Sequence, residues 1–516
     1  MKIERTKNAS RNIVFGILLK VYQLAVPFAM RTAMIYFMGI QYLGLNSLFA
    51  SILEVLNLAE LGVGSAMVFS MYKPIAEDDK SKICALMKLY RTMYRIIGLV
   101  ICVVGLALTP AIPKLIHSDV PPDMNVYFLY LMNLGTTVIS YWLFAYKNCL
   151  FGAFQRGDVT SKISIATTTV QYAIQFFIVI AVKNYYWYLI AAMGTQIMNN
   201  IITAIAASKR WPDYRPVGKL DKEEQRSIMN RVKDLFTAKV GGTIVNSADT
   251  IVISAFLGLS MLAIYQNYFY VVTALIGFVN IIFGATTAGI GNSLIVETKE
   301  KNFRDLSKFT FLIAWVTGWS GCTMFCLFQP FIEIWVGKGL QLKFFAVVCF
   351  VIYYYVYLIN QLLCTYKDAG GIWHADRFRP LVTAGVNLAL NLLTVKHLGV
   401  YGVLLSTVVS TLLVGLPWLL HNLFTTLFDK KYLAGYLKHL VIYTVIAAAV
   451  CAGTYGICTL IPLERWGALI VRLAVCIVMP NLIFFIFYRK MPEFGPSVEI
   501  VDRMTHGKLH LKKLVH

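Results

Sequence analysis

Long apolar runs separated by short polar stretches make up most of the chain. Fourteen of these runs approach the length of about 20 residues that a helix needs to cross the hydrocarbon core of a membrane. Their approximate positions are 13–38, 43–72, 92–113, 125–146, 163–182, 187–207, 238–259, 265–293, 309–331, 344–365, 380–396, 400–426, 439–461 and 467–488. The pattern predicts an all-α polytopic membrane protein with about 14 transmembrane helices.

A polar interval divides the first twelve runs into six and six. We expect an N-terminal six-helix lobe at 1–207, a cytoplasmic basic linker at 208–237 and a C-terminal six-helix lobe at 238–426. The last two runs predict an extra transmembrane helix pair at 427–488. A cytoplasmic basic tail at 489–516 follows.

A short internal repeat supports two related halves. The segment Tyr42–Leu48 enters the second run, and the similar segment Phe256–Leu262 enters the eighth run 214 residues later. Internal duplication of this kind is typical of transporters. Because six is an even number of spans, we expect both halves to have the same orientation in the membrane.

The basic residues are distributed unevenly along this pattern. The chain has 58% hydrophobic and 14% charged residues and a formal net charge of +21. If the N-terminus is cytoplasmic, 38 of the 47 lysines and arginines lie in inner segments, six in outer connections and three within spans. Inner loops are the ones enriched in Lys and Arg, so we predict cytoplasmic N- and C-termini. The positive net charge is then explained by the orientation of the chain in the membrane, and we expect no nucleic-acid partner.

Two features of the inner segments and the N-terminus complete the topology. Asp221 and the charged residues that follow it predict a short capped helix at the membrane surface. The first run contains Lys20 and Arg31 and has no small-residue cleavage site. We therefore interpret it as a retained first helix and not as a cleaved signal peptide.

Sequence motifs of enzymes and metal sites are missing. The chain has no GxxxxGK[ST] loop, no HExxH and no GxSxG, and its outer loops are short. Most of the ten cysteines fall inside apolar segments, without CxxC or Cys/His ligand spacing. We predict a protein that is not an enzyme, with no disulfide framework, no metal site and no cofactor.

Charged residues inside the spans are the most informative candidates for function. A centred Arg, Lys or Asp costs about 2.5–3.5 kcal/mol on insertion scales, so it must face protein or water. Arg31 lies four residues after Pro27, Lys20 lies about three turns earlier near the same face, and Arg472 lies near the start of the last run. One interpretation is a hydrated cavity whose cations bind an anionic headgroup. The other is that these side chains pair with acids and fasten helices.

Acidic and neutral polar residues also occur within the runs. Glu54, Glu60 and Asp249 are candidates for charge pairing, for instance Glu60 with Arg31, or for coupling transport to H⁺ or Na⁺. Neutral polar candidates for lining a cavity are Gln171, Gln175, Asn267 and Asn360. Each of these amides also suits a hydrogen bond between helices.

Several multi-residue segments resemble one protein family. They are Arg31–Thr32, Tyr42–Phe49, Leu58–Ala66, Tyr72–Ala76, Asn246–Thr250, Gln266–Tyr268, Tyr366–Gly371 and Arg377–Pro380. These segments are similar to bacterial polysaccharide flippases of the Wzx type, over nearly the whole chain. The resemblance implies the multidrug/oligosaccharidyl-lipid/polysaccharide exporter (MOP) superfamily, in which two six-helix lobes form a V around a central cavity.

The resemblance also implies a function. We expect alternating access that moves an undecaprenyl-pyrophosphate-linked oligosaccharide from the cytoplasmic to the outer leaflet of a bacterial inner membrane, for cell-surface polysaccharide biosynthesis. A polysaccharide polymerase and glycosyltransferases are the expected partners, besides membrane lipid. Arg31 matches the region where relatives carry first-helix cations facing the lumen; Lys20 and Arg472 are further candidates. The eighth run lacks a basic residue, so we do not expect the second-lobe cationic site of related lipid II flippases.

Two alternatives stay open. A cation-coupled multidrug exporter of the same fold would prefer acidic cavity walls, and Glu54, Glu60 and Asp249 are consistent with it. A membrane glycosyltransferase or polymerase is less favoured, because the chain lacks a large outer loop and a nucleotide motif.

Overall fold

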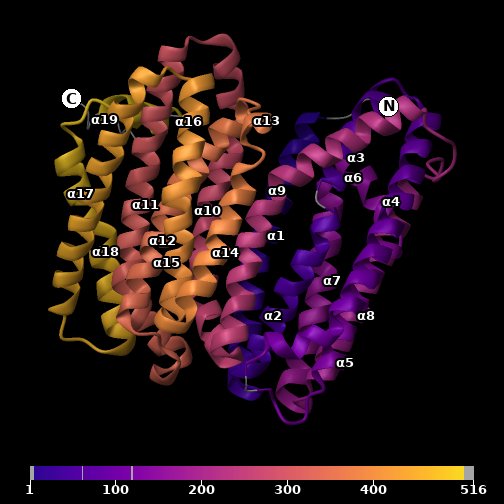
Figure 1. Cartoon of the computed structure of the whole chain (residues 1–516), viewed down its shortest axis with the longest axis horizontal. Helices are drawn as coiled ribbons and strands as arrows, with labels where there is room; N and C mark the ends of the chain where they lie inside the picture. Colours follow the sequence, from indigo (N-terminus) through magenta and orange to yellow (C-terminus); the bar gives the residue numbers. More distant parts are fainter. Residues whose placement is uncertain (1–4, 61, 118–119, 505–516) are drawn as a thin grey trace. The chain divides into compact units, whose positions relative to one another are not determined.

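The computed structural model describes residues 5–60, 62–117 and 120–504, and within these ranges the chain consists of helices and the turns that join them (Figure 1). Contacts divide the chain into two compact units, Met1–Ala263 and Ile264–His516. The helices that lie mainly in the first unit are α1 (Arg5–Phe37), α2 (Ile40–Leu56), η1 (Asn57–Glu60), α3 (Val63–Ala76), α4 (Lys80–Leu108), η2 (Thr109–Leu115), α5 (Val126–Trp142), η3 (Ala145–Lys147), α6 (Asn148–Ala153), α7 (Gly157–Phe177), η4 (Ile178–Val182), α8 (Tyr185–Arg210) and α9 (Lys222–Leu257).

The second unit is also helical. Its elements are most of α10 (Leu259–Val296), then α11 (Lys299–Val336), η5 (Lys338–Leu340), α12 (Phe344–Ala369), α13 (Trp373–Asp376), α14 (Arg379–Leu398), α15 (Val400–Ser410), η6 (Thr411–Gly415), α16 (Leu416–Thr426), η7 (Lys430–Tyr432), α17 (Leu433–Thr459), α18 (Arg465–Tyr488) and α19 (Phe494–Met504). Every predicted run lies on one helix or on consecutive helices, and the all-α polytopic fold is confirmed.

The described helices are long and apolar enough for a multi-pass membrane protein. Twelve of them could cross a membrane by length and composition, or thirteen if the bent pair of α5 with η3 and α6 is one span. Helix α1 is 33 residues long and carries the first predicted run, 13–38. Lys20 and Arg31 lie within it.

Helix α9 differs from the short capped helix that the sequence predicts. It begins after Asp221 and continues for 36 residues to Leu257, because no proline interrupts it before Gly258, whose φ of 88° ends the helix. The helix is bound to the first unit: the Ser254 hydroxyl donates to the Leu115 carbonyl at 2.8 Å. The predicted division into two six-helix lobes stays a prediction.

The starts of α2 and α10 resemble each other in backbone geometry. Gly39 has a φ of 121° just before α2, and Gly258 has a φ of 88° just before α10. These conformations favour glycine. Gly44 in α2 is required for a different reason, since a Cβ atom there would lie 2.3 Å from the carbonyl oxygen of Leu259.

Each unit has a buried arginine–aspartate pair beside the start of a long helix. At α7, Arg156 Nε and Nη2 donate to the two carboxylate oxygens of Asp158 at 2.7 and 3.0 Å. At α14, Arg379 Nε and Nη2 donate to both oxygens of Asp376 at 2.7 and 2.8 Å. These two-point contacts fix the helix starts.

Helix α11 is the centre of the second unit and contacts α12, α17 and α18. Tryptophan side chains of α11 attach it to α18: Trp315 Nε1 donates to Asn481 Oδ1 and Trp319 Nε1 donates to the Cys476 carbonyl, each at 2.9 Å. The extra helix pair, α17 and α18, therefore packs against α11 in the core of this unit.

Candidate functional site

The apolar run 43–72 does not form one continuous helix. The structure divides it into α2, the short η1 and α3, and Gly62 adopts a left-handed conformation with φ 89° at the start of α3. A break in a membrane helix leaves backbone polar groups without helical partners, which is tolerated only where protein or a water-filled cavity surrounds them. Broken helices of this kind form substrate and ion sites in transporters.

Glu60 lies at this break, and tyrosines hold both of its carboxylate oxygens. Tyr94 of α4 donates to Oε1 at 2.8 Å, and Tyr141 of α5 donates to Oε2 at 3.0 Å. Tyr90 in turn donates to the Tyr94 hydroxyl at 2.5 Å. We call Tyr90, Tyr94 and Tyr141 the tyrosine cage. Within the described part of the chain no ion pair involves Glu60, and the cage gives each of its carboxylate oxygens a hydrogen bond.

A cavity of about 630 Å³ opens beside Glu60 in the first unit. Residues of α3, α4, α6 and α7 line it together with Glu60, among them Ser65, Tyr72, Asn148 and Thr160. Gly64 keeps the space next to the cage, because a Cβ atom there would lie 3.3 Å from the Tyr90 hydroxyl. A carboxylate, hydroxyls, an amide and aromatic rings can bind sugar hydroxyl groups or a cation.

Arg31 lies in another part of the first unit. It is half-buried in α1, and its charge acts on the hydroxyl of Tyr188 in α8. Gln175 of α7 is fully buried and donates to the Tyr188 carbonyl at 3.1 Å, while Gln171 donates to Gln175 at 3.4 Å. Both predicted glutamines thus lie on α7, against which the Arg31 helix α1 packs, whereas the Lys20 side chain is exposed.

The other predicted acids lie on α2 and α9. Glu54 is exposed and accepts a hydrogen bond from Ser247 of α9 at 3.3 Å. Asp249 is buried in α9. These contacts connect the two helices, and a role of either acid in ion coupling stays a prediction.

The remaining predicted residues belong to the second unit. Asn267 is fully buried in α10, and Asn360 of α12 lies against Cys364, with Nδ2 and Sγ 3.8 Å apart. Arg472 is half-buried in α18, one turn before Cys476. The structure therefore places Arg472 in a different unit from Arg31 and Lys20.

The tyrosine cage was not among the residues predicted from the sequence. Tyr90 and Tyr94 are four residues apart and so share a helix face, which is a signal that the sequence contains. Tyr141 comes from another helix, and only packing could show that it meets Glu60.

Comparison with known families identifies the chain. Residues 9–288, more than half of the sequence, match the family model described as polysaccharide biosynthesis protein. The chain belongs to this family. Among curated proteins, no sequence matches it.

Solved structures show the fold. The lipid II flippase MurJ, in an inward closed conformation, is similar with a TM-score of 0.65 and 15% identity, over 93% of this chain and 99% of that chain. An inward-facing multidrug resistance MATE family transporter of the MOP superfamily has a TM-score of 0.59 and 12% identity, over 82% and 99%. A MATE transporter from Vibrio cholerae has a TM-score of 0.52 and 12% identity, over 81% and 96%.

The family match concerns polysaccharide biosynthesis, and the solved structures show the fold alone. They are consistent with a lipid-linked flippase or another transporter of the MOP superfamily. They leave the substrate open.

Proposed function

We propose that the protein translocates an undecaprenyl-pyrophosphate-linked oligosaccharide from the cytoplasmic to the outer leaflet of a bacterial inner membrane. The family match at residues 9–288 is the observation that carries this proposal, because the family is one of polysaccharide biosynthesis. The proposal includes cytoplasmic termini and a place beside a polysaccharide polymerase and glycosyltransferases. It requires no resident cofactor.

A polar cavity within a membrane helix bundle supports this function. A glycan must cross about 30 Å of hydrocarbon, and a polar cavity replaces the water that its hydroxyl groups lose. The cavity beside Glu60 measures about 630 Å³, which lies within the usual range for ligand sites. In our proposal its hydroxyl groups, amide and aromatic rings contact the sugar.

Arg31 is the proposed contact for the pyrophosphate. It is half-buried on α1, which packs against α7, the helix that carries the buried Gln175. Charge-assisted hydrogen bonds from arginine suit phosphate geometry. Lys20, with its exposed side chain, and Arg472, in the second unit, are less well placed for the same role.

An apolar cavity in the second unit suits the isoprenoid chain. It measures about 640 Å³, and α11, α12 and α17 supply most of its lining, including Val351, Leu440 and Val441. Aliphatic walls bind a prenyl chain through the hydrophobic effect. The tail then stays in an apolar environment while the headgroup crosses.

Driving force for export comes from two sources in this proposal. Outward movement of an anion is favoured by about 2.3 kcal/mol per charge for each 100 mV of membrane potential. Glu60 is the proposed group for coupling to H⁺ or Na⁺, since its carboxyl group lines the cavity and hydrogen-bonds only to neutral partners among the described residues. Alternating access of two lobes would expose the site to each side in turn.

The test is glycan export in a deletion strain. We expect lipid-linked oligosaccharide to accumulate on the inner leaflet, and the wild-type gene to restore export. Arg31→Ala should fail to restore it, Arg31→Lys should restore it in part, and Arg215→Ala, which removes an exposed loop arginine, should restore it fully. Normal export by Arg31→Ala, inserted at the wild-type level, would contradict the assignment of Arg31.

One observation favours a second candidate function. An acid with neutral hydrogen-bond donors beside an aromatic-lined cavity also suits a cation-coupled multidrug exporter. In that case deletion would cause drug hypersensitivity without glycan accumulation, and Glu60→Gln would abolish drug efflux.

A further inference from the structure

Five cysteines from three helices gather inside the second unit. Cys322 and Cys326 lie one turn apart on α11, Cys451 and Cys458 lie two turns apart on α17, and Cys476 lies on α18. All five are free thiols. Their sequence separations gave no ligand pattern, so this cluster arises only from the packing of α17 and α18 on α11.

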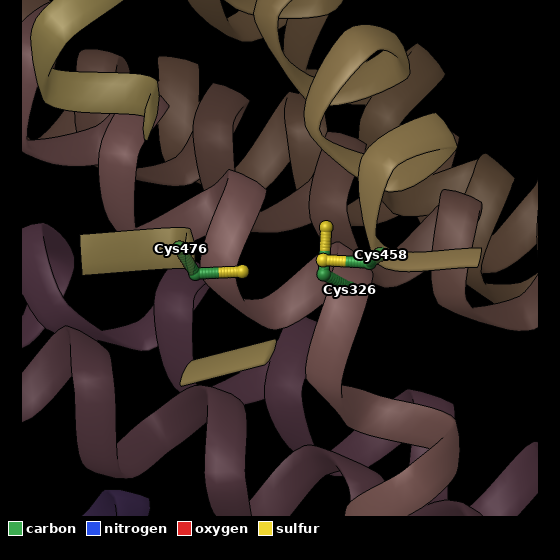
Figure 2. Close-up of side chains that lie close together, drawn as sticks. All are labelled: Cys326, Cys458 and Cys476. Atoms are coloured by element: carbon green, nitrogen blue, oxygen red, sulfur yellow. The ribbon is translucent and has the colours of Figure 1, made fainter. Parts of the chain in front are cut away.

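Three of these thiols are close enough to share one ion. The Sγ atoms of Cys326, Cys458 and Cys476 lie within 4.8 Å of one another, and all three residues are buried. Figure 2 shows Cys326 and Cys458 side by side, with the sulfur of Cys476 directed toward them. A tetrahedral zinc site with Zn–S bonds of about 2.3 Å needs sulfur atoms somewhat under 4 Å apart, so side-chain adjustments of about half an ångström suffice.

Two polar side chains beside the thiols have unsatisfied groups. Thr454 is fully buried, and its hydroxyl lies next to the Cys322 thiol without a hydrogen bond of normal geometry in the described part of the chain. The Arg472 Nε atom is buried and has no hydrogen-bond partner among the described residues. Arg472 and Cys476 are four residues apart in α18, so their side chains lie on the same face of the helix.

The charges of the thiolates, a bound metal ion and Arg472 can balance one another. A buried cation without a counter-charge is costly in a membrane, and so is a buried anionic cluster. Cysteine binds a metal ion through its deprotonated sulfur. Three thiolates around a divalent ion have a net charge of −1, and the Arg472 guanidinium brings the assembly to zero. A monovalent ion would leave a net charge of −1.

We propose that Cys326, Cys458 and Cys476 bind one zinc ion, with a water molecule in the fourth position and Arg472 as the counter-charge. Binding releases three thiol protons to water as three Zn–S bonds form. Cys322 and Thr454 lie beside the trio and complete its polar surroundings. The ion links α17 and α18 to α11. In this proposal Arg472 balances the charge of the thiol cluster and does not bind the headgroup.

The experiment uses the purified full-length protein in detergent, reduced and freed of metal. We expect it to bind about one Zn²⁺ per chain, measured by elemental mass spectrometry, and to unfold at a higher temperature with Zn²⁺ than without it. Cd²⁺, a spectroscopic substitute, should give the ultraviolet charge-transfer band of cadmium thiolates. Absence of this band from the folded wild-type protein, or a disulfide among these cysteines, would overturn the proposal.

Variants separate the metal site from simple packing. Cys326→Ala, Cys458→Ala and Cys476→Ala should each lose the cadmium band, whereas Cys349→Ala, which alters an equally buried cysteine of α12, should keep it. Arg472→Gln should weaken Zn²⁺ affinity about tenfold, and Arg472→Lys should restore most of it. Equal loss of the band in Cys349→Ala, or unchanged Zn²⁺ affinity in all three alanine variants, would contradict the assignment. The wild-type measurement decides the question even if a variant does not fold.

Discussion

The two buried arginine–aspartate pairs have the same local chemistry in different surroundings. In both, an arginine holds an aspartate through two hydrogen bonds, and a lysine lies nearby: Lys162 at 3.9 Å from Asp158, and Lys367 at 3.6 Å from Asp376. The Lys162 side chain is 51% exposed, but that of Lys367 is 8% exposed. Removing the aspartate should therefore destabilise the protein more in the second unit, because water cannot reach the cations there to replace the lost carboxylate.

The largest effect is expected for Asp376→Asn. This change leaves Arg379 and Lys367 buried without their shared carboxylate, although Asp368 still contacts Lys367 at 2.8 Å. We expect the free energy of unfolding to fall by about 3–5 kcal/mol. Thermal unfolding in detergent measures it, with Asp429→Asn, which alters a partly exposed pair, as the control.

Asp158→Asn should cost less than Asp376→Asn. Arg156 is 15% exposed and Lys162 is 51% exposed, so both cations retain contact with water after the change. We expect a loss of about 2 kcal/mol in the same measurement. Equal losses of unfolding free energy for the two variants would show that exposure of the cations does not determine how strongly each aspartate stabilises the protein.

Asn422→Ala tests a further hydrogen bond to the aspartate of the second pair. Asn422 is buried and donates to Asp376 Oδ1 at 3.1 Å. Because Arg379 keeps its two hydrogen bonds, we expect a loss of only about 1 kcal/mol. A double variant with Asp376→Asn should lose less than the sum of the single changes, since both act on one network.

The smallest effect is expected at an exposed pair, Lys80 with Asp213. Their side chains are 61% and 65% exposed and the ion pair measures 2.7 Å. The hydrogen bond from Lys80 lowers the pKa of Asp213, so the pair stabilises the protein above the pKa of an unfolded aspartate. This contribution is lost as the pH falls through the lowered pKa of the folded state.

Lys80→Ala should therefore reduce stability slightly at neutral pH and not at all in strong acid. High salt should also remove the difference, because screening weakens exposed ion pairs. A Lys80→Ala effect as large as that of Asp376→Asn would remove the distinction between exposed and buried pairs.

The helices were predictable because span length and apolar composition are local properties of a sequence. Every predicted run lies on a helix or a broken helix of the structure. The break at Asn57–Glu60 was not predicted, since the apolar pattern continues across it. The length of α9 was underestimated, because its charged start and apolar end have different composition but no residue that ends a helix between them.

The candidate sites were predictable only in part. Helical spacing relates Gln171 to Gln175, and the structure joins them by a hydrogen bond. Intramembrane charge drew attention to Glu60, but its tyrosine partners come from α4 and α5. Spacing along one helix carries no information about which neighbouring helix contributes the opposite group.

By itself, the sequence determined the class of the protein: a multi-pass helical membrane protein whose resemblance to polysaccharide flippases the family match bears out. Apolar run length and family segments are properties of single stretches, so no packing is needed to recognise them. Only the tertiary structure decided that tyrosines enclose Glu60 and that Arg472 lies at a thiol cluster. It also decided that the cations around Asp376 are less exposed to water than those around Asp158. Those outcomes depend on side-to-side packing, which brings together residues that are far apart in the chain.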